Sequence, residues 1–159
     1  MALLPSFSFT AQTDFLGYYA SLPVGSSFFT MLLRQAGIEA DDTLIDYGDL
    51  ASLLLGTSDE AIFQSYERKP VTVTRSVRPA TNDIFYTLTA SVTWEKAGSS
   101  SGGANDTVAK ALTCWRPSAA AADSAIKPCW ATRIVGTTDG NNMTFRLPNG
   151  LGLVDSVQA

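Results

Sequence analysis

The hydrophobic pattern of the chain changes its period part of the way along. In the second half, apolar and polar residues alternate, as they do in half-buried strands. The clearest example is DIFYTLTASVTWEKA (83–97), in which every second side chain from Ile84 to Trp94 is apolar. The same pattern predicts further strands at 71–77, 107–117, 126–136 and 143–148.

The region before these strands has helical spacing instead. SSFFTMLLRQAG (26–37) predicts a helix that is apolar on nearly every side, and such a helix must be covered by its own fold or by another subunit. Residues 48–66 predict a short helical junction. In this junction leucines at helical spacing follow Asp49, and a second capped turn carries Phe63 and Tyr66.

Aromatic side chains concentrate near the N-terminus. Residues 6–10 predict a short strand, and the segment has two interpretations. It is either an edge strand packed on the chain's own core or an arm whose aromatic side chains dock on a neighbouring subunit. In the second interpretation the candidate partner interface consists of Phe7, Phe9, Phe15, Tyr18, Tyr19, Phe28 and Phe29.

The order of these elements favours an antiparallel sheet structure, because several short strands follow one another without long helices between them. We expect a mainly β fold with short N-terminal helices, arranged as a jelly-roll-like β-sandwich. The expected organisation is an interface-forming N-terminal arm and helix at 1–40, followed by a β-sandwich domain at 41–159 that includes the helical junction at 48–66.

The amino-acid composition limits the classes of function that the chain can have. Hydrophobic residues make up 45 % of the chain and charged residues only 16 %, whereas about a quarter is usual for soluble domains. This favours a surface covered by a partner, although a well-filled β core is the alternative. The chain has no histidine, which excludes Ser-His and Cys-His nucleophile pairs and leaves two cysteines as a poor zinc site. The carboxylates lack EF-hand spacing, which disfavours a calcium site. With these groups missing, we expect no enzyme, no cofactor and no metal.

The charge is divided unequally between the two halves. Residues 1–66 contain one basic and eight acidic residues, a net charge of −7, and residues 67–159 contain ten basic and seven acidic residues, a net charge of +3. Neither half predicts binding to nucleic acid, because the first would repel phosphate and the second is only weakly basic.

The start of the chain lacks the basic residues and apolar run of a signal peptide, and no stretch reaches the about eighteen apolar residues of a membrane span. We therefore expect synthesis in a cytoplasm and no membrane partner. Cys114 and Cys129 lie on consecutive predicted strands and could face each other across an antiparallel pair. A disulfide is sterically conceivable, but cytoplasmic synthesis favours buried thiols.

Several motifs in order carry a family resemblance: LASLLLGTSDEAIFQSYERKPVTVT, then TNDIFYTLTASVTW, then GGANDTVAKALTCW, then IKPCWA. Together they cover roughly residues 44–131, and the resemblance does not extend to residues 1–40. This run resembles structural proteins of tailed bacteriophages, in particular capsid decoration or cement proteins. The resemblance implies a component of the virion, on the capsid exterior, that bridges subunits of the major capsid protein. The resemblance also favours assembly of the chain as a homotrimer.

Two other functions remain as alternatives. The first is a tail- or fibre-associated β-sandwich module that binds a host-surface glycan by stacking sugar rings on Trp94, Trp115 and Trp130, although Trp94 lies on the apolar face of its strand. The second is a hydrolase with paired carboxylates, which the sequence disfavours because the acidic residues cluster around capped turns. Arg68 and Lys69 could pair with capsid carboxylates or simply solvate the start of a strand.

Overall fold

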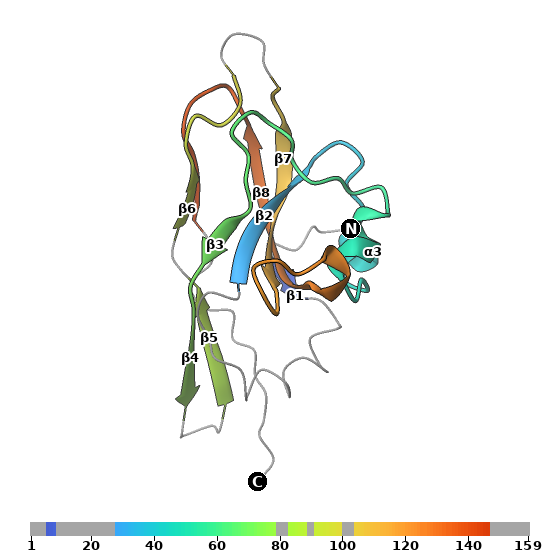
Figure 1. Cartoon of the computed structure of the whole chain (residues 1–159), viewed down its shortest axis with the longest axis vertical. Coiled ribbons are helices and arrows are strands. Elements are labelled where there is room, and N and C mark those ends of the chain that lie inside the picture. Colours follow the sequence, from blue (N-terminus) through green and yellow to red (C-terminus); the bar gives the residue numbers. More distant parts are fainter. Residues whose placement is uncertain (1–5, 9–27, 79–82, 89–90, 100–103, 147–159) are drawn as a thin grey trace.

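The structure is a computed structural model that describes residues 6–8, 28–78, 83–88, 91–99 and 104–146. Its largest element is a five-stranded antiparallel sheet with the strand order β1-β8-β7-β2-β3 (Figure 1). The strands of this sheet are β1 (Ser6–Ser8), β2 (Phe28–Arg34), β3 (Lys69–Val71), β7 (Thr107–Trp115) and β8 (Lys127–Thr137).

Two smaller antiparallel sheets complete the strands. One joins β4 (Val73–Arg78) to β5 (Asp83–Leu88), and the other joins β6 (Ser91–Trp94) to β9 (Met143–Arg146). The short helices α2 (Asp41–Leu44) and α3 (Leu50–Leu54) and the 3₁₀ turn η1 (Asp123–Ala125) complete the described elements.

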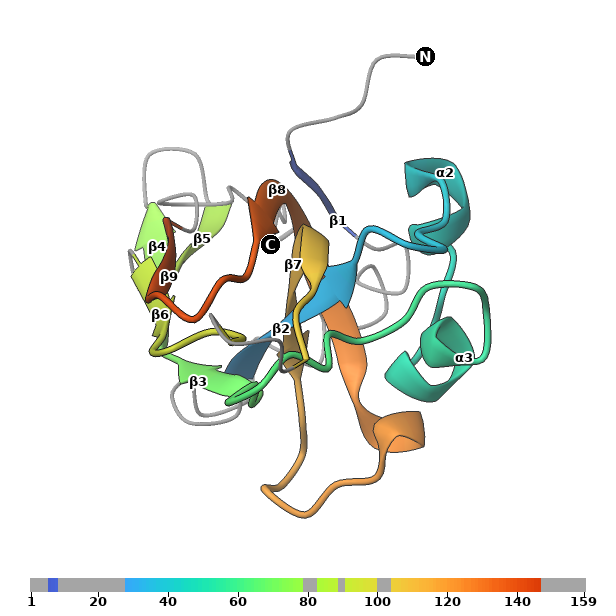
Figure 2. The ribbon, with the colours of Figure 1, turned by 90° about the horizontal axis from the view of Figure 1, so that it is seen from above.

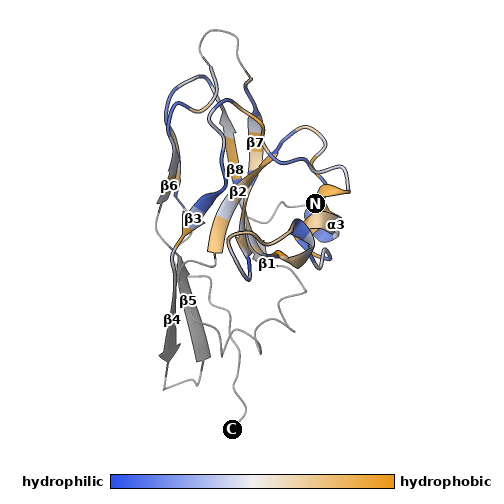
Figure 3. Ribbon diagram, viewed as in Figure 1, coloured by the Kyte–Doolittle hydropathy of each residue, from blue (hydrophilic) through white to orange (hydrophobic). Residues whose placement is uncertain are grey.

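The large sheet has a hydrophobic core on each of its two faces. Seen from above, α2 and α3 lie on one side of β2 and β7, and β6 and β9 lie on the other (Figure 2). The helix-side core packs Leu44, Leu50 and Leu53 against the sheet, and the strand-side core packs Val92 and Trp94 against its other face. Hydrophobic positions accordingly occupy much of β7 and β8 (Figure 3).

The predicted helix at 26–37 is wrong, because this segment contains the strand β2. Alternate side chains of β2 enter different cores: Phe28 and Leu32 belong to the strand-side core, whereas Phe29, Met31 and Leu33 belong to the helix-side core. A strand that is buried on both faces has apolar residues at nearly every position, and a helix that is covered on all sides has the same pattern. β2 lies between β3 and β7, within the same sheet as the C-terminal strands.

The helical junction is confirmed in part. Helix α3 forms at the predicted leucines, and the Asp49 carboxylate caps it by accepting a 2.8 Å hydrogen bond from the backbone N–H of Ser52. The second predicted turn, which carries Phe63 and Tyr66, is present but is not helical: the N–H of Tyr66 donates to the carbonyl of Phe63 at 3.0 Å, and residues 61–68 contain no helix. Ser58 does not cap a turn there; its hydroxyl donates to the Glu39 carboxylate at 3.0 Å.

The prediction of a mainly β, antiparallel fold is confirmed, and the described sheets are open rather than closed. Residues 83–97 hold two strands with different partners, β5 with β4 and β6 with β9, where the sequence predicted one. In β6 the predicted alternation is present, since Val92 and Trp94 are buried while Ser91 and Thr93 are exposed.

The two cysteines are buried thiols, as the favoured interpretation predicted. Cys114 pairs with Pro128, and a register shift follows Thr113, so that Cys129 is an extra residue in β8. Cys114 lies in the helix-side core and Cys129 in the strand-side core, so the two thiols do not face each other.

Candidate functional site

The two edges of the large sheet differ in how they are covered. At the β3 side, β3 pairs with residues 28–30 of β2, and the irregular stretch 59–66 covers the rest of that strand. The N–H of Ala61 donates to the carbonyl of Leu32 at 2.9 Å, and the N–H of Arg34 donates to the carbonyl of Asp59 at 2.9 Å. This edge of β2, which we call the β2 edge, is therefore closed.

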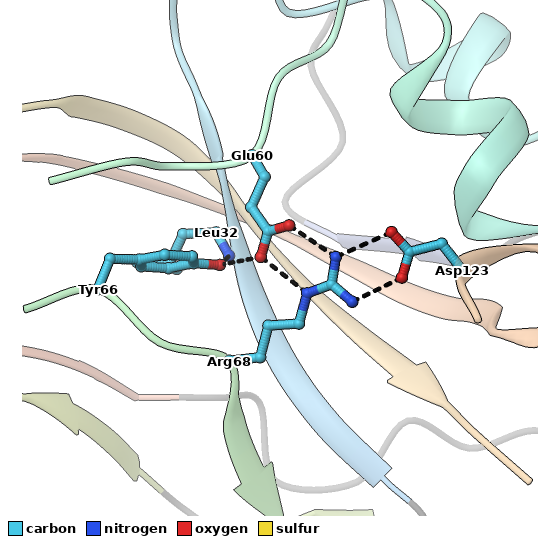
Figure 4. Close-up of polar contacts among 5 residues, drawn as sticks. All are labelled: Leu32, Glu60, Tyr66, Arg68 and Asp123. Carbon is cyan, nitrogen blue, oxygen red and sulfur yellow. Dashed lines mark hydrogen bonds and ion pairs between the residues drawn. The ribbon is translucent and has the colours of Figure 1, made fainter. Parts of the chain in front are cut away.

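A tyrosine hydroxyl completes this closure. The backbone N–H of Leu32 donates to the Tyr66 hydroxyl at 3.1 Å, and that hydroxyl donates in turn to Glu60 Oε1 at 2.7 Å (Figure 4). Burial and the adjacent Glu60 carboxylate raise the pKa of Tyr66 well above its usual value, so its hydroxyl stays protonated and can donate.

Arg68 holds this arrangement in place. Its guanidinium contacts Glu60 through Nε at 2.9 Å and Nη2 at 2.7 Å, and it reaches Asp123 in η1 through Nη1 at 2.7 Å (Figure 4). The hydrogen bonds to Glu60, followed by those to Asp123, raise the pKa of Arg68 further above its already high value. Arg68 is thus engaged within its own chain, and Lys69 pairs with Glu67.

A second polar network fixes the same stretch to the start of β7. The Asp106 side chain, which is only 1 % exposed, forms an ion pair with Arg34 at 2.8 Å and accepts the backbone N–H of Ile62 at 2.5 Å. Its own N–H donates to the Thr138 hydroxyl at 2.8 Å. A buried carboxylate with this many partners makes the β2 edge a rigid part of the scaffold.

The opposite edge of the sheet is covered much less. Strand β1 pairs with residues 130–132 of β8. Within the described parts of the chain, residues 133–137 have β7 on one side and no strand on the other. Arg133 and Val135 are exposed there, and Val135, at 69 %, is one of three large aliphatic side chains among the described residues with most of their surface exposed. We call residues 133–137 the β8 edge.

A groove of about 360 Å³ runs beside the β8 edge, between β7, β8 and the segment that leads into α2. Its apolar lining comes from Ile38, Ala40, Ala109 and Val135. Ala109 is an extra residue in β7 relative to β2, because Leu33 pairs with Lys110 while Arg34 pairs with Val108. Such a bulge changes the direction of a strand locally, and here it lies in the groove wall.

The charges at the floor of the groove are already paired. Lys110 Nζ lies 2.6 Å from Asp41 Oδ1, outside good hydrogen-bond geometry, and donates to the Glu39 carbonyl at 3.4 Å. The Glu39 carboxylate accepts hydrogen bonds from the Tyr47 hydroxyl at 2.9 Å and from Ser58. Arg133, at the mouth, has no ion pair among the described residues. The groove therefore presents apolar walls and one available guanidinium.

The predicted interface residues fall in three places. Phe28 and Phe29 are buried in the two cores, at 0 % and 1 % exposure, so they are not a surface that a partner could cover. Two guanidinium groups, of Arg68 and Arg116, lie over the Phe29 ring at 5.6 and 5.3 Å. Phe7 lies in β1 opposite Ala131. The remaining four, Phe9, Phe15, Tyr18 and Tyr19, lie outside the described residues.

The tryptophans belong to the core. Trp94, Trp115 and Trp130 are 0 %, 8 % and 3 % exposed, and the Trp94 indole N–H donates to the carbonyl of Glu67 at 2.8 Å. They offer no aromatic platform on which a sugar ring could stack.

Sequence reasoning missed the groove. Its lining comes from three segments that the sheet brings together, around residues 35–41, 109–110 and 133–135. The available signal was Val135 next to Arg133 near the end of a predicted strand, which by itself is common. In the described residues no cluster of three or more acidic or sulfur ligands could hold a metal ion. None of the described helices has the length and apolar character needed to cross a membrane.

Comparisons with models of protein families, with curated proteins and with solved structures found no match to this chain.

Proposed function

We propose that the chain is a structural protein that attaches to a larger protein assembly through the β8 edge. The observation that carries this proposal is the unequal protection of the two edges. The β2 edge is closed by main-chain bonds, a buried tyrosine and two ion-pair networks, whereas the β8 edge is left open beyond residue 132 in the part of the chain that the structure describes. Proteins usually protect exposed edges, because an open edge is a template for another strand.

Strand β1 supports this proposal. It adds to β8 as a short antiparallel strand, and among the described residues no strand pairs with the next residues of the same edge. A partner strand placed beyond β1 would continue the sheet with main-chain hydrogen bonds, which is how many β proteins bind extended segments.

The identity of the assembly is proposed from the sequence resemblance. A cement protein on the exterior of a phage capsid bridges major capsid protein subunits, and it needs contact area rather than catalytic groups. The jelly-roll-like sandwich and the homotrimer are finer parts of the same proposal.

The test is a pair of matched substitutions. Val135 and Ile62 are both exposed aliphatic side chains, at 69 % and 64 %, but only Val135 lies on the β8 edge. A lysine on an edge strand blocks strand addition. We expect Val135→Lys to reduce attachment to particles of the phage that encodes the chain, measured by co-sedimentation, and Ile62→Lys to leave it unchanged. Equal attachment of both variants would refute docking at the β8 edge.

The N-terminal arm is the competing attachment site. Deletion of residues 1–25 removes β1, yet none of the described core residues lies in that segment, so we expect circular dichroism of the truncated chain to keep its β signal. If truncation abolishes attachment while Val135→Lys does not, the arm rather than the edge holds the assembly.

A further inference from the structure

The groove beside the β8 edge determines which side chains an added strand can carry. Side chains of a strand alternate between the two faces of a sheet, so every second residue of a strand paired with 133–137 faces the groove. Arg133 and Val135 already line that groove, which fixes the face concerned. On the other face, a Cβ added at Gly136 would lie 3.4 Å from Phe145 and 3.5 Å from Met143, both in β9. That face is the crowded one.

The size and lining of the groove suit side chains rather than a whole ligand. Its volume of about 360 Å³ is near the lower end of the about 300–1,000 Å³ that is typical of ligand pockets. Ile38, Ala40, Ala109 and Val135 supply an apolar wall. An apolar side chain from an added strand would be removed from water there, and it would cover the exposed surface of Val135.

The charge of the groove selects a second side chain. Lys110 is paired with Asp41, and the Glu39 carboxylate is bonded to Tyr47 and Ser58. Arg133 is left as the group that can accept a new ionic partner. Because positions i and i+2 of a strand share a face, an acidic residue two positions from the apolar one would lie beside Arg133.

We propose that the chain recognises, by strand addition at the β8 edge, an extended segment of its assembly partner that carries an apolar side chain and, two residues along, a carboxylate. This inference rests on the proposed function and specifies the chemistry of the partner. Main-chain hydrogen bonds attach the partner segment, and the lining of the groove determines which side chains that segment carries.

The experiment uses short capped peptides in which threonine alternates with valine. One peptide carries an aspartate two residues from a valine on the same face, and a second carries a lysine in its place. A third is the aspartate peptide with N-methylated backbone amides. Binding to the full chain is followed by fluorescence anisotropy at low salt. We expect the aspartate peptide to bind more tightly than the lysine peptide by about two- to fivefold, the range of an exposed ion pair. The N-methylated peptide should not bind.

Variants of the chain assign the effect to the groove. Arg133→Glu should reverse the order of the two charged peptides, whereas Arg146→Glu, which changes the same charge on exposed β9, should preserve it. Ala109→Leu should fill the groove and weaken both peptides. The proposal is overturned if Arg133→Glu leaves the order unchanged, or if the N-methylated peptide binds as well as its parent.

Two further outcomes separate this inference from the proposed function. If Arg133→Glu binds particles normally while Val135→Lys does not, the edge is the attachment site but the acidic segment is wrong. If the chain alone forms oligomers that Val135→Lys dissolves, the occupant of the edge is a second copy, and recognition of a partner segment is overturned.

Discussion

The hydroxyl of Tyr66 closes the β2 edge, and its removal by Tyr66→Phe tests that closure. The Leu32 side chain is fully buried, and the Leu32 N–H bonds the Tyr66 hydroxyl at 3.1 Å. In the variant the ring stays in place, with its edge-to-face contact to Phe63 at 5.1 Å, so no cavity forms. Glu60 keeps both hydrogen bonds to Arg68 and remains compensated. The change therefore isolates one main-chain donor that loses its partner.

A buried donor left unpaired costs about 1–3 kcal/mol. With a urea m-value near 2 kcal/mol/M, which is typical of small proteins, the midpoint of unfolding should fall by roughly 0.5–1.5 M without a change in slope. Tyr47→Phe is the matched control, because its hydroxyl bonds Glu39 in a part-buried site and Glu39 keeps its bond from Ser58. We expect the control to lose less than about 1 kcal/mol. Equal losses in the two variants would refute the closure by Tyr66.

Three further predictions concern the scaffold. Phe63 is 2 % exposed in the strand-side core, so Phe63→Ala should cost about 3–5 kcal/mol in denaturant titration, and a loss below about 1 kcal/mol would place it outside the core. The pKa of Tyr66 is raised above its ordinary value of 10.0, so above pH 10 the folded chain retains a proton that the unfolded chain releases. The contribution of Tyr66 to the free energy of unfolding is therefore complete below pH 10 and should decline above it. Tyr66→Phe should remove this decline. Burial raises the pKa of the Cys114 thiol, and Cys129 is 1 % exposed, so iodoacetamide should label neither cysteine in the native chain and both in denaturant; rapid native labelling would contradict the buried assignment.

The sequence predicts strands well where one face meets water. In β6, exposed Ser91 and Thr93 alternate with buried Val92 and Trp94, and that alternation identifies a strand. It fails at β2, because cores on both sides of the sheet demand apolar residues at nearly every position from 28 to 33 and erase the period. The choice between helix and strand there depends on what covers the segment, which is a tertiary property.

The candidate site was beyond sequence reasoning for a related reason. Arg68 looked available to a partner, but Glu60 and Asp123 approach it from other parts of the chain and occupy its guanidinium. The groove likewise depends on a bulge at Ala109 and on the register of β1, whose first residue, Ser6, is opposite Thr132. Neither the ion pairs nor the open edge leaves a local pattern, because both arise from strand pairing between residues far apart in sequence.

The central claim is that an assembly partner adds a strand to the β8 edge. Hydrogen exchange of the backbone amides, compared between the free chain and the chain attached to the particles proposed as its assembly, tests this most directly. The account predicts new protection within residues 133–137 and little change at Leu32, which is already bonded in the free chain. Protection that appears on attachment only outside the β8 edge would contradict the account.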